Sequence, residues 1–134
     1  MKTVVVLGGY GNFGRRIVAA LAREPGVRVF VGGRDMKQAR AAAQETGGAA
    51  EPMHLDAHAP DLARRLRELA ASIVIHTAGP FQGQTYTVPR ACIAAGAHYI
   101  DLADGRAYVC GIQALDEEAR SNQTLIVSGA SSVP

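Results

Sequence analysis

The sequence lacks the patterns that indicate a metal centre, a membrane segment or a nucleic-acid-binding surface. Its two cysteines, Cys92 and Cys110, form no C-x-x-C pair, and small buried thiols of this kind are typical of a reducing cytoplasm. No apolar run approaches the length of a membrane span, about 20 residues, and Val4–Leu7 is too short for a signal peptide. The net charge of +2 is too small to indicate nucleic acid. We therefore expect a cytoplasmic protein that binds neither membrane nor nucleic acid.

One short segment still contains several side chains that can bind metals, namely His54, Asp56 and His58. They alternate along an extended stretch and so share one face, but that face offers no fourth ligand. The polar end of a strand explains them better, and we predict no metal site.

The sequence does contain a regular alternation of strand and helix patterns. Its 134 residues are enough for one domain with a single core, and 48% of them are apolar. Strands are expected at about Lys2–Leu7, Val27–Val31, Ala50–Leu55, Ser72–Thr77, Ala97–Leu102 and Thr124–Ser128, and helices at about Asn12–Arg23, Met36–Thr46, Pro60–Ala70, Pro89–Ala95 and Gln113–Asn122. Such alternation indicates a doubly wound α/β domain, the six-stranded parallel sheet of the Rossmann fold, in the order 3-2-1-4-5-6.

A glycine motif joins the first strand to the first helix. Gly9, Gly11 and Gly14 give the spacing G-x-G-x-x-G, which is weak by itself but stands in the strand-to-helix context that dinucleotide binding requires. We expect Gly9 to allow the tight turn, Gly11 to admit a pyrophosphate and Gly14 to bring the helix close to the strand. The amides of Asn12 and Phe13 complete the phosphate site. The alternative is a glycine-rich turn without a ligand.

Two residues after the second strand compete for the adenosine ribose. Arg34 can pair with the 2′-phosphate of NADP, because its planar guanidinium matches phosphate oxygens. Asp35 can instead accept hydrogen bonds from the ribose hydroxyls of NAD or of S-adenosylmethionine. A purely structural role also explains Asp35 fully, because Asp35 followed by Gln38 is typical of the N-cap of a helix. Arg34 comes first after the strand, so we predict NADP, with NAD as the alternative and S-adenosylmethionine as a further one.

Catalytic residues cannot be assigned from the motifs. His76 ends the fourth strand and is either a cofactor contact or a satisfied polar residue. Tyr99 and Asp101 share one face of the fifth strand, and His98 points to the other. Asp101 is the best single candidate there, but its carboxylate can equally cap the turn that follows. No tyrosine is followed four positions later by lysine, which disfavours the short-chain dehydrogenases.

Four segments together carry a family resemblance: Val4–Gly14, Gly33-Arg34-Asp35, Thr77-Ala78-Gly79-Pro80-Phe81 and Gly96-Ala97-His98-Tyr99-Ile100-Asp101-Leu102. From Lys2 to Pro134 the sequence resembles the NADP-binding N-terminal domain of the saccharopine dehydrogenase-like oxidoreductases. The resemblance implies that Gly79 and Pro80 shape the loop beside the nicotinamide and that Asp56 lies near the adenine.

The resemblance also implies what a complete enzyme does. Such enzymes transfer hydride between the nicotinamide and an imine, amine or carbonyl carbon of a small molecule. They continue into a substrate-binding and dimerisation domain, which is missing here, so we expect residues 1–134 to be an inactive cofactor-binding fragment of an enzyme that can form a homodimer. The alternative is a non-catalytic module that senses NADP.

Overall fold

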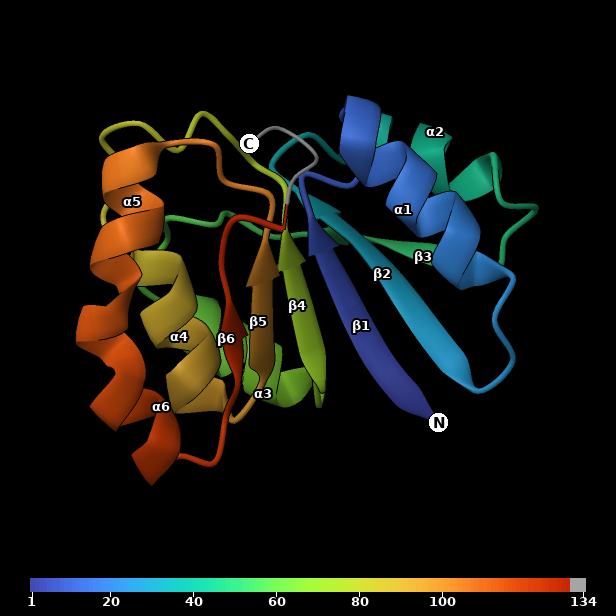
Figure 1. Cartoon of the computed structure of the whole chain (residues 1–134). Coiled ribbons are helices and arrows are strands. Elements are labelled where there is room, and N and C mark those ends of the chain that lie inside the picture. The colour runs from blue at the N-terminus through green and yellow to red at the C-terminus, as the bar shows by residue number, and fades with distance from the viewer. Residues whose placement is uncertain (131–134) are drawn as a thin grey trace.

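The computed structural model describes residues 1–130, which form a six-stranded parallel sheet in the order β3-β2-β1-β4-β5-β6 (Figure 1). The strands are β1 (Lys2–Leu7), β2 (Val27–Gly33), β3 (Ala50–His54), β4 (Ile73–His76), β5 (His98–Asp101) and β6 (Ile126–Val127). The predicted doubly wound Rossmann order is therefore confirmed. Residues 131–134 of the predicted domain lie outside the described part.

Helices pack on both faces of the sheet (Figure 1). They are α1 (Asn12–Ala22), α2 (Met36–Gln44), α3 (Leu62–Glu68), α4 (Thr87–Ala95), α5 (Arg106–Gly111), the 3-10 turn η1 (Ile112–Leu115) and α6 (Asp116–Ser121). α1 and α2 cover β1, β2 and β3 on one face, and α3 and α4 cover the opposite face. The side chains of β1 alternate between these two layers, since Val6 packs with Val18 of α1 and Val5 packs with Leu66 of α3.

Two helices differ from what their sequences suggest. Phe13 is an apolar residue in the first turn of α1, yet it is 65% exposed, and Gly14 and Val18 make the buried contact with the sheet. The segment after β5 is helical from Arg106, where the sequence predicts a helix only from Gln113. Tyr108, Leu115 and Ala119 are buried along this segment, at spacings that one helix face would give.

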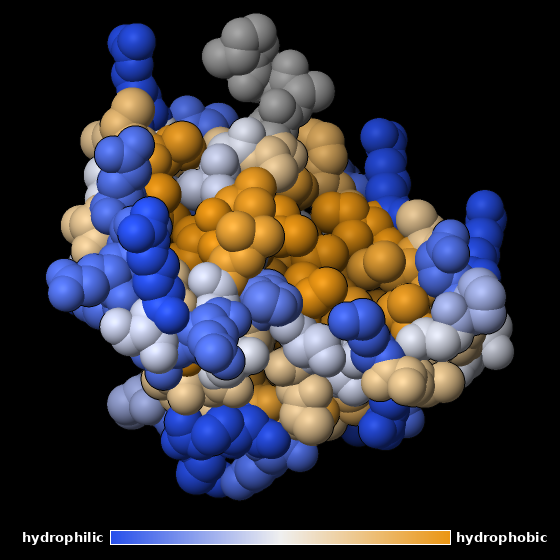
Figure 2. Space-filling view, turned by 60° about the horizontal axis from the view of Figure 1, so that its bottom comes forward, coloured by the Kyte–Doolittle hydropathy of each residue, from blue (hydrophilic) through white to orange (hydrophobic). Residues whose placement is uncertain are grey.

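One half of a sheet face has no helix over it in the described part of the chain. This is the β4–β6 half of the face that α1 and α2 cover elsewhere, and apolar side chains are exposed across the middle of the space-filling view (Figure 2). Leu125, beside β6, is 62% exposed, and Ile75 and Ile100 are partly exposed. Within residues 1–130, no helix has the length and apolar character needed to span a membrane.

Candidate cofactor-binding site

A cleft of about 330 Å³ opens at the carboxyl ends of the central strands. It is lined by Leu7, Gly8, Tyr10, Gly11, Gly32, Gly33, Arg34, Leu55, Asp56, Ala57, His58, Thr77, Ala78 and Gly79. The chain leaves β1 toward β2 on one side, and β4 pairs with β1 on the other. The cleft therefore lies at the point where the strand order reverses, which is where doubly wound sheets bind their ligands.

The turn after β1 depends on a glycine that the motif does not include. Gly8 has a φ of 77°, and a Cβ added to it would lie 2.9 Å from Thr77 Oγ1. Thr77 Oγ1 donates to the carbonyl oxygens of Leu7 and Gly8 at 2.7 and 3.1 Å. The positive φ of this turn thus occurs at Gly8, one residue before Gly9, which is the first glycine of the motif. The only sequence signal for this is that Gly8 and Gly9 are adjacent.

The three motif glycines lie in different surroundings. A Cβ on Gly9 would come within 2.9 Å of Val31 Cγ1, and a Cβ on Gly14 would collide with the carbonyl oxygen of Gly8. Both glycines therefore let α1 pack closely on the sheet. A Cβ on Gly11 would meet only the Gly8 oxygen, at 3.4 Å. Packing within the protein therefore does not require a glycine at position 11.

The N-terminus of α1 begins beside this turn. Gly11 occupies the N-cap position, and no side chain caps the helix. Asn12 and Phe13 form the first turn and are both exposed. The first amides of a helix point away from its body and carry partial positive charge, so this end suits an anion.

Arg34 and Asp35 differ sharply in their surroundings. The carboxylate of Asp35 caps α2, since Oδ1 accepts from the amides of Lys37 and Gln38 at 3.0 and 3.2 Å. Its Oδ2 accepts from the side-chain amide of Gln38 at 2.8 Å, and this bond above all lowers the pKa of Asp35. Arg34 lines the cleft, and within residues 1–130 its guanidinium makes no ion pair or hydrogen bond. The side chain free for a ligand is therefore the arginine.

The segment after β3 forms the neighbouring wall of the cleft. The amide of Leu55 donates to the carbonyl oxygen of Gly33 at 3.0 Å, so this segment continues beside the end of β2. Asp56 Oδ1 accepts from the amide of His58 at 2.9 Å, which closes a tight turn. Asp56 therefore lies in the same cleft as Arg34.

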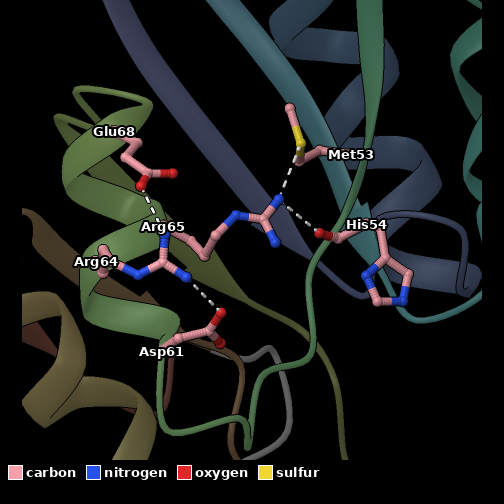
Figure 3. A network of polar contacts seen from close by, with 6 residues as sticks. All are labelled: Met53, His54, Asp61, Arg64, Arg65 and Glu68. Carbon is pink, nitrogen blue, oxygen red and sulfur yellow. Dashed lines mark hydrogen bonds and ion pairs between the residues drawn. The ribbon is translucent and has the colours of Figure 1, made fainter.

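A polar network on α3 holds the start of this wall (Figure 3). Arg65 reaches from α3 and donates to the carbonyl oxygen of His54 at 3.0 Å and to the sulfur of Met53 at 3.4 Å. Arg64 on the same helix pairs with Asp61 and Glu68 at 3.0 and 2.7 Å.

Within the described residues, no three His, Cys, Asp or Glu side chains lie where they could share a metal ion.

The opposite wall comes from the loop after β4. Gly79 lines the cleft, whereas the adjoining Pro80 is exposed outside it. His76 is buried beneath the loop: its Nε2 lies 3.2 Å from Gln84 Oε1, and its Nδ1 accepts from the amide of Ala78 at 3.4 Å. Burial lowers the pKa of His76. This histidine is thus a satisfied polar residue that supports the loop.

Asp101 lies beyond this wall, and its hydrogen bonds stabilise the fold. Its buried carboxylate accepts from the hydroxyl of Tyr99 at 2.6 Å and from the hydroxyl of Ser128 at 2.9 Å. It also accepts from the amides of Ala103 and Gly129 at 3.0 and 2.8 Å. These bonds join the ends of β5 and β6, and Asp101 does not line the cleft.

A second tyrosine extends the Asp101 network. The hydroxyls of Tyr99 and Tyr108 lie 2.9 Å apart. Burial raises the pKa of Tyr99, and it raises the pKa of Tyr108 to about 12. Both hydroxyls therefore stay protonated at neutral pH and act as donors within the network.

The strand order, the switch-point cleft and the glycine turn define a dinucleotide-binding Rossmann domain. Residues 4–127 match the family model described as the saccharopine dehydrogenase NADP binding domain. The chain therefore belongs to this family, as its sequence predicts, and NADP is the cofactor of the family domain. A comparison with curated proteins finds no match.

Solved structures share the fold at low sequence identity. Saccharopine dehydrogenase (L-Glu forming) from Saccharomyces cerevisiae is 20% identical with a TM-score of 0.77, over 97% of this chain and 27% of the yeast chain. The 3-hydroxyacyl-CoA dehydrogenase type-2 from Mycobacterium avium is 16% identical with a TM-score of 0.73, over 95% and 71% of the two chains. BdcA, solved in complex with NADPH, is 18% identical with a TM-score of 0.65, over 95% and 68%. The present chain thus spans about a quarter of the length of the yeast enzyme.

Proposed function

We propose that this chain is the cofactor-binding part of an oxidoreductase that prefers NADP to NAD, and that Arg34 recognises the 2′-phosphate. The observation that carries the proposal is the contrast between two adjacent side chains. Asp35 uses both carboxylate oxygens to cap α2, so it has little capacity left for ribose hydroxyls. Arg34 lines the cleft without a partner among residues 1–130. A charge-assisted hydrogen bond from such an arginine is worth about 1.5–3 kcal/mol.

Other residues of the cleft are proposed to contact the remaining parts of the cofactor. No other side chain fills the space beside Gly11, and we propose that the pyrophosphate lies there. The first amides of α1, at Asn12 and Phe13, would bind it with their partial positive charge. Asp56 and Gly79 both line the cleft, and we propose that Asp56 with its tight turn faces the adenine and that Gly79 faces the nicotinamide. When bound, the nicotinamide supplies hydride transfer, and the protein supplies position.

The substrate is a proposal of a different kind, because it belongs to a longer protein. The yeast structure contains several times more chain than the part that matches here. We propose a second domain that holds a small-molecule substrate with an imine, amine or carbonyl carbon at the open carboxyl edge of the sheet, and that provides the contacts of a homodimer. The isolated cofactor-binding chain would then bind NADP without turning over a substrate.

Calorimetric titration of the chain with NADPH, NADH and S-adenosylmethionine side by side tests the proposed cofactor preference. We expect NADPH to bind about 10- to 150-fold more tightly than NADH, which is the range that one charge-assisted hydrogen bond gives. S-adenosylmethionine should release no measurable heat. Tighter binding of S-adenosylmethionine than of either dinucleotide would overturn the proposal.

A further inference from the structure

Tyr10 connects the glycine turn to the end of β2. It follows Gly9 in the turn, and its partly buried ring reaches across to Gly33, the last residue of β2. A Cβ added to Gly33 would collide with the edge of this ring and would lie 2.7 Å from the hydroxyl oxygen. Gly33 lies in an extended strand, where any residue can adopt the backbone conformation. Glycine is needed there because the Tyr10 ring occupies the place of a side chain.

The hydroxyl of Tyr10 reaches the other side of the same segment. It accepts from the amide of Asp35 at 3.4 Å. Tyr10 therefore touches the residues immediately before and after Arg34, and both Tyr10 and Arg34 line the cleft. The turn that holds the pyrophosphate position is thereby connected to the turn that presents the arginine.

We propose that Tyr10 is a positioning residue that holds the backbone on both sides of Arg34, so that the guanidinium is presented to the 2′-phosphate. The proposal rests on the proposed role of Arg34. When the backbone around Arg34 is already fixed, less conformational entropy is lost as the phosphate binds. Tyr10 thus favours NADPH over NADH without itself contacting the phosphate.

The ring and the hydroxyl contribute unequally. A donor–acceptor distance of 3.4 Å is long for a hydrogen bond to a hydroxyl, so the hydroxyl adds little. The ring fills the space over Gly33 and excludes other conformations of the turn. Tyr10→Phe keeps this contact and is the matched control, while Tyr10→Ala removes it.

The experiment measures the Kd values of NADPH and NADH for each variant by calorimetry. Tyr10→Ala should lower the NADPH preference about fivefold, chiefly through weaker NADPH binding, and Tyr10→Phe should keep it within about twofold of the original. In an Arg34→Ala background, Tyr10→Ala should leave the remaining preference unchanged, because residues that act as a unit are not additive.

A second route reaches the same contact without changing the tyrosine. Gly33→Ala places a methyl group where the ring lies, so it should displace the ring and lower the preference as Tyr10→Ala does. In a Tyr10→Ala background the same methyl group has space, so Gly33→Ala should then have no further effect. Thermal unfolding without ligand identifies any variant that fails to fold.

The outcomes separate the two proposals. Equal losses of NADPH and NADH affinity in Tyr10→Ala, or an additive effect in the Arg34→Ala background, would overturn the positioning role and leave the role of Arg34 intact. An unchanged preference in Arg34→Ala alone would overturn the role of Arg34, and the positioning role with it.

Discussion

The two halves of the carboxyl edge of the sheet differ in whether certain polar side chains have hydrogen-bond partners within the protein. On the β1–β3 side, Arg34 lines the cleft without a partner in the described part of the chain, and Gly11 leaves an open space. On the β4–β6 side, His76, Gln84 and Asp101 are all hydrogen-bonded within the protein. No buried side-chain nitrogen or oxygen among residues 1–130 lacks a hydrogen-bond partner.

This difference distinguishes side chains that are available to bind a ligand from side chains that stabilise the fold. A buried polar group that is already satisfied gains little from a ligand, and it loses stability when its partners are removed. An exposed cation beside an open glycine turn contributes little to folding and much to anion binding. Substitution of Gly11 or Arg34 should therefore change cofactor affinity, and substitution of Asp101 should change stability.

Gly11→Val gives the largest expected effect on binding. The backbone at Gly11 is extended, with φ −78° and ψ 176°, so valine is sterically allowed and the fold should survive. Its side chain would fill the pyrophosphate position, and we expect the affinity for NADPH and NADH to fall about 100-fold or more, beyond calorimetric detection.

Gly11→Ala provides a graded control for this substitution. Its single methyl group would lie 3.4 Å from the Gly8 oxygen, an ordinary contact, so it should weaken binding less than valine does. If Gly11→Val still binds NADPH at full affinity while its melting temperature is unchanged, the glycine turn is purely structural.

Asp101→Ala should have the opposite signature. It removes the acceptor for two hydroxyls and two amides at the ends of β5 and β6, and each buried donor left unpaired costs about 1–3 kcal/mol. We expect the free energy of unfolding in urea to fall by about 3 kcal/mol or more. The NADPH preference of the folded protein should not change. A loss of that preference at full stability would place Asp101 in the site.

Sequence patterns predict the features that depend on neighbouring residues. The alternation of apolar runs gives the sheet order, and Asp35 with Gln38 gives the cap of α2. The glycine spacing locates the turn after β1, and the cleft opens beside it. Each of these signals lies within a few residues of the feature that it predicts, or follows from the right-handed crossover rule.

The features that sequence reasoning missed depend on contacts between distant segments. The ring of Tyr10 fits only because residue 33 is a glycine, and the carboxylate of Asp101 accepts a hydrogen bond from Ser128, which follows the neighbouring strand β6. Phe13 has a hydrophobic side chain at a helical spacing, yet Gly14 and Val18 decide which face of α1 meets the sheet. No local pattern records which distant segment a side chain will meet.

The most direct test of the difference between the two halves is the Kd of NADPH and of NADH for Arg34→Ala, measured against the unaltered chain. Removing the guanidinium should weaken NADPH binding about tenfold or more and leave NADH binding within about twofold, because only NADPH carries the 2′-phosphate. An equal loss for both cofactors, or no loss for NADPH, would contradict the assignment of Arg34 to the 2′-phosphate.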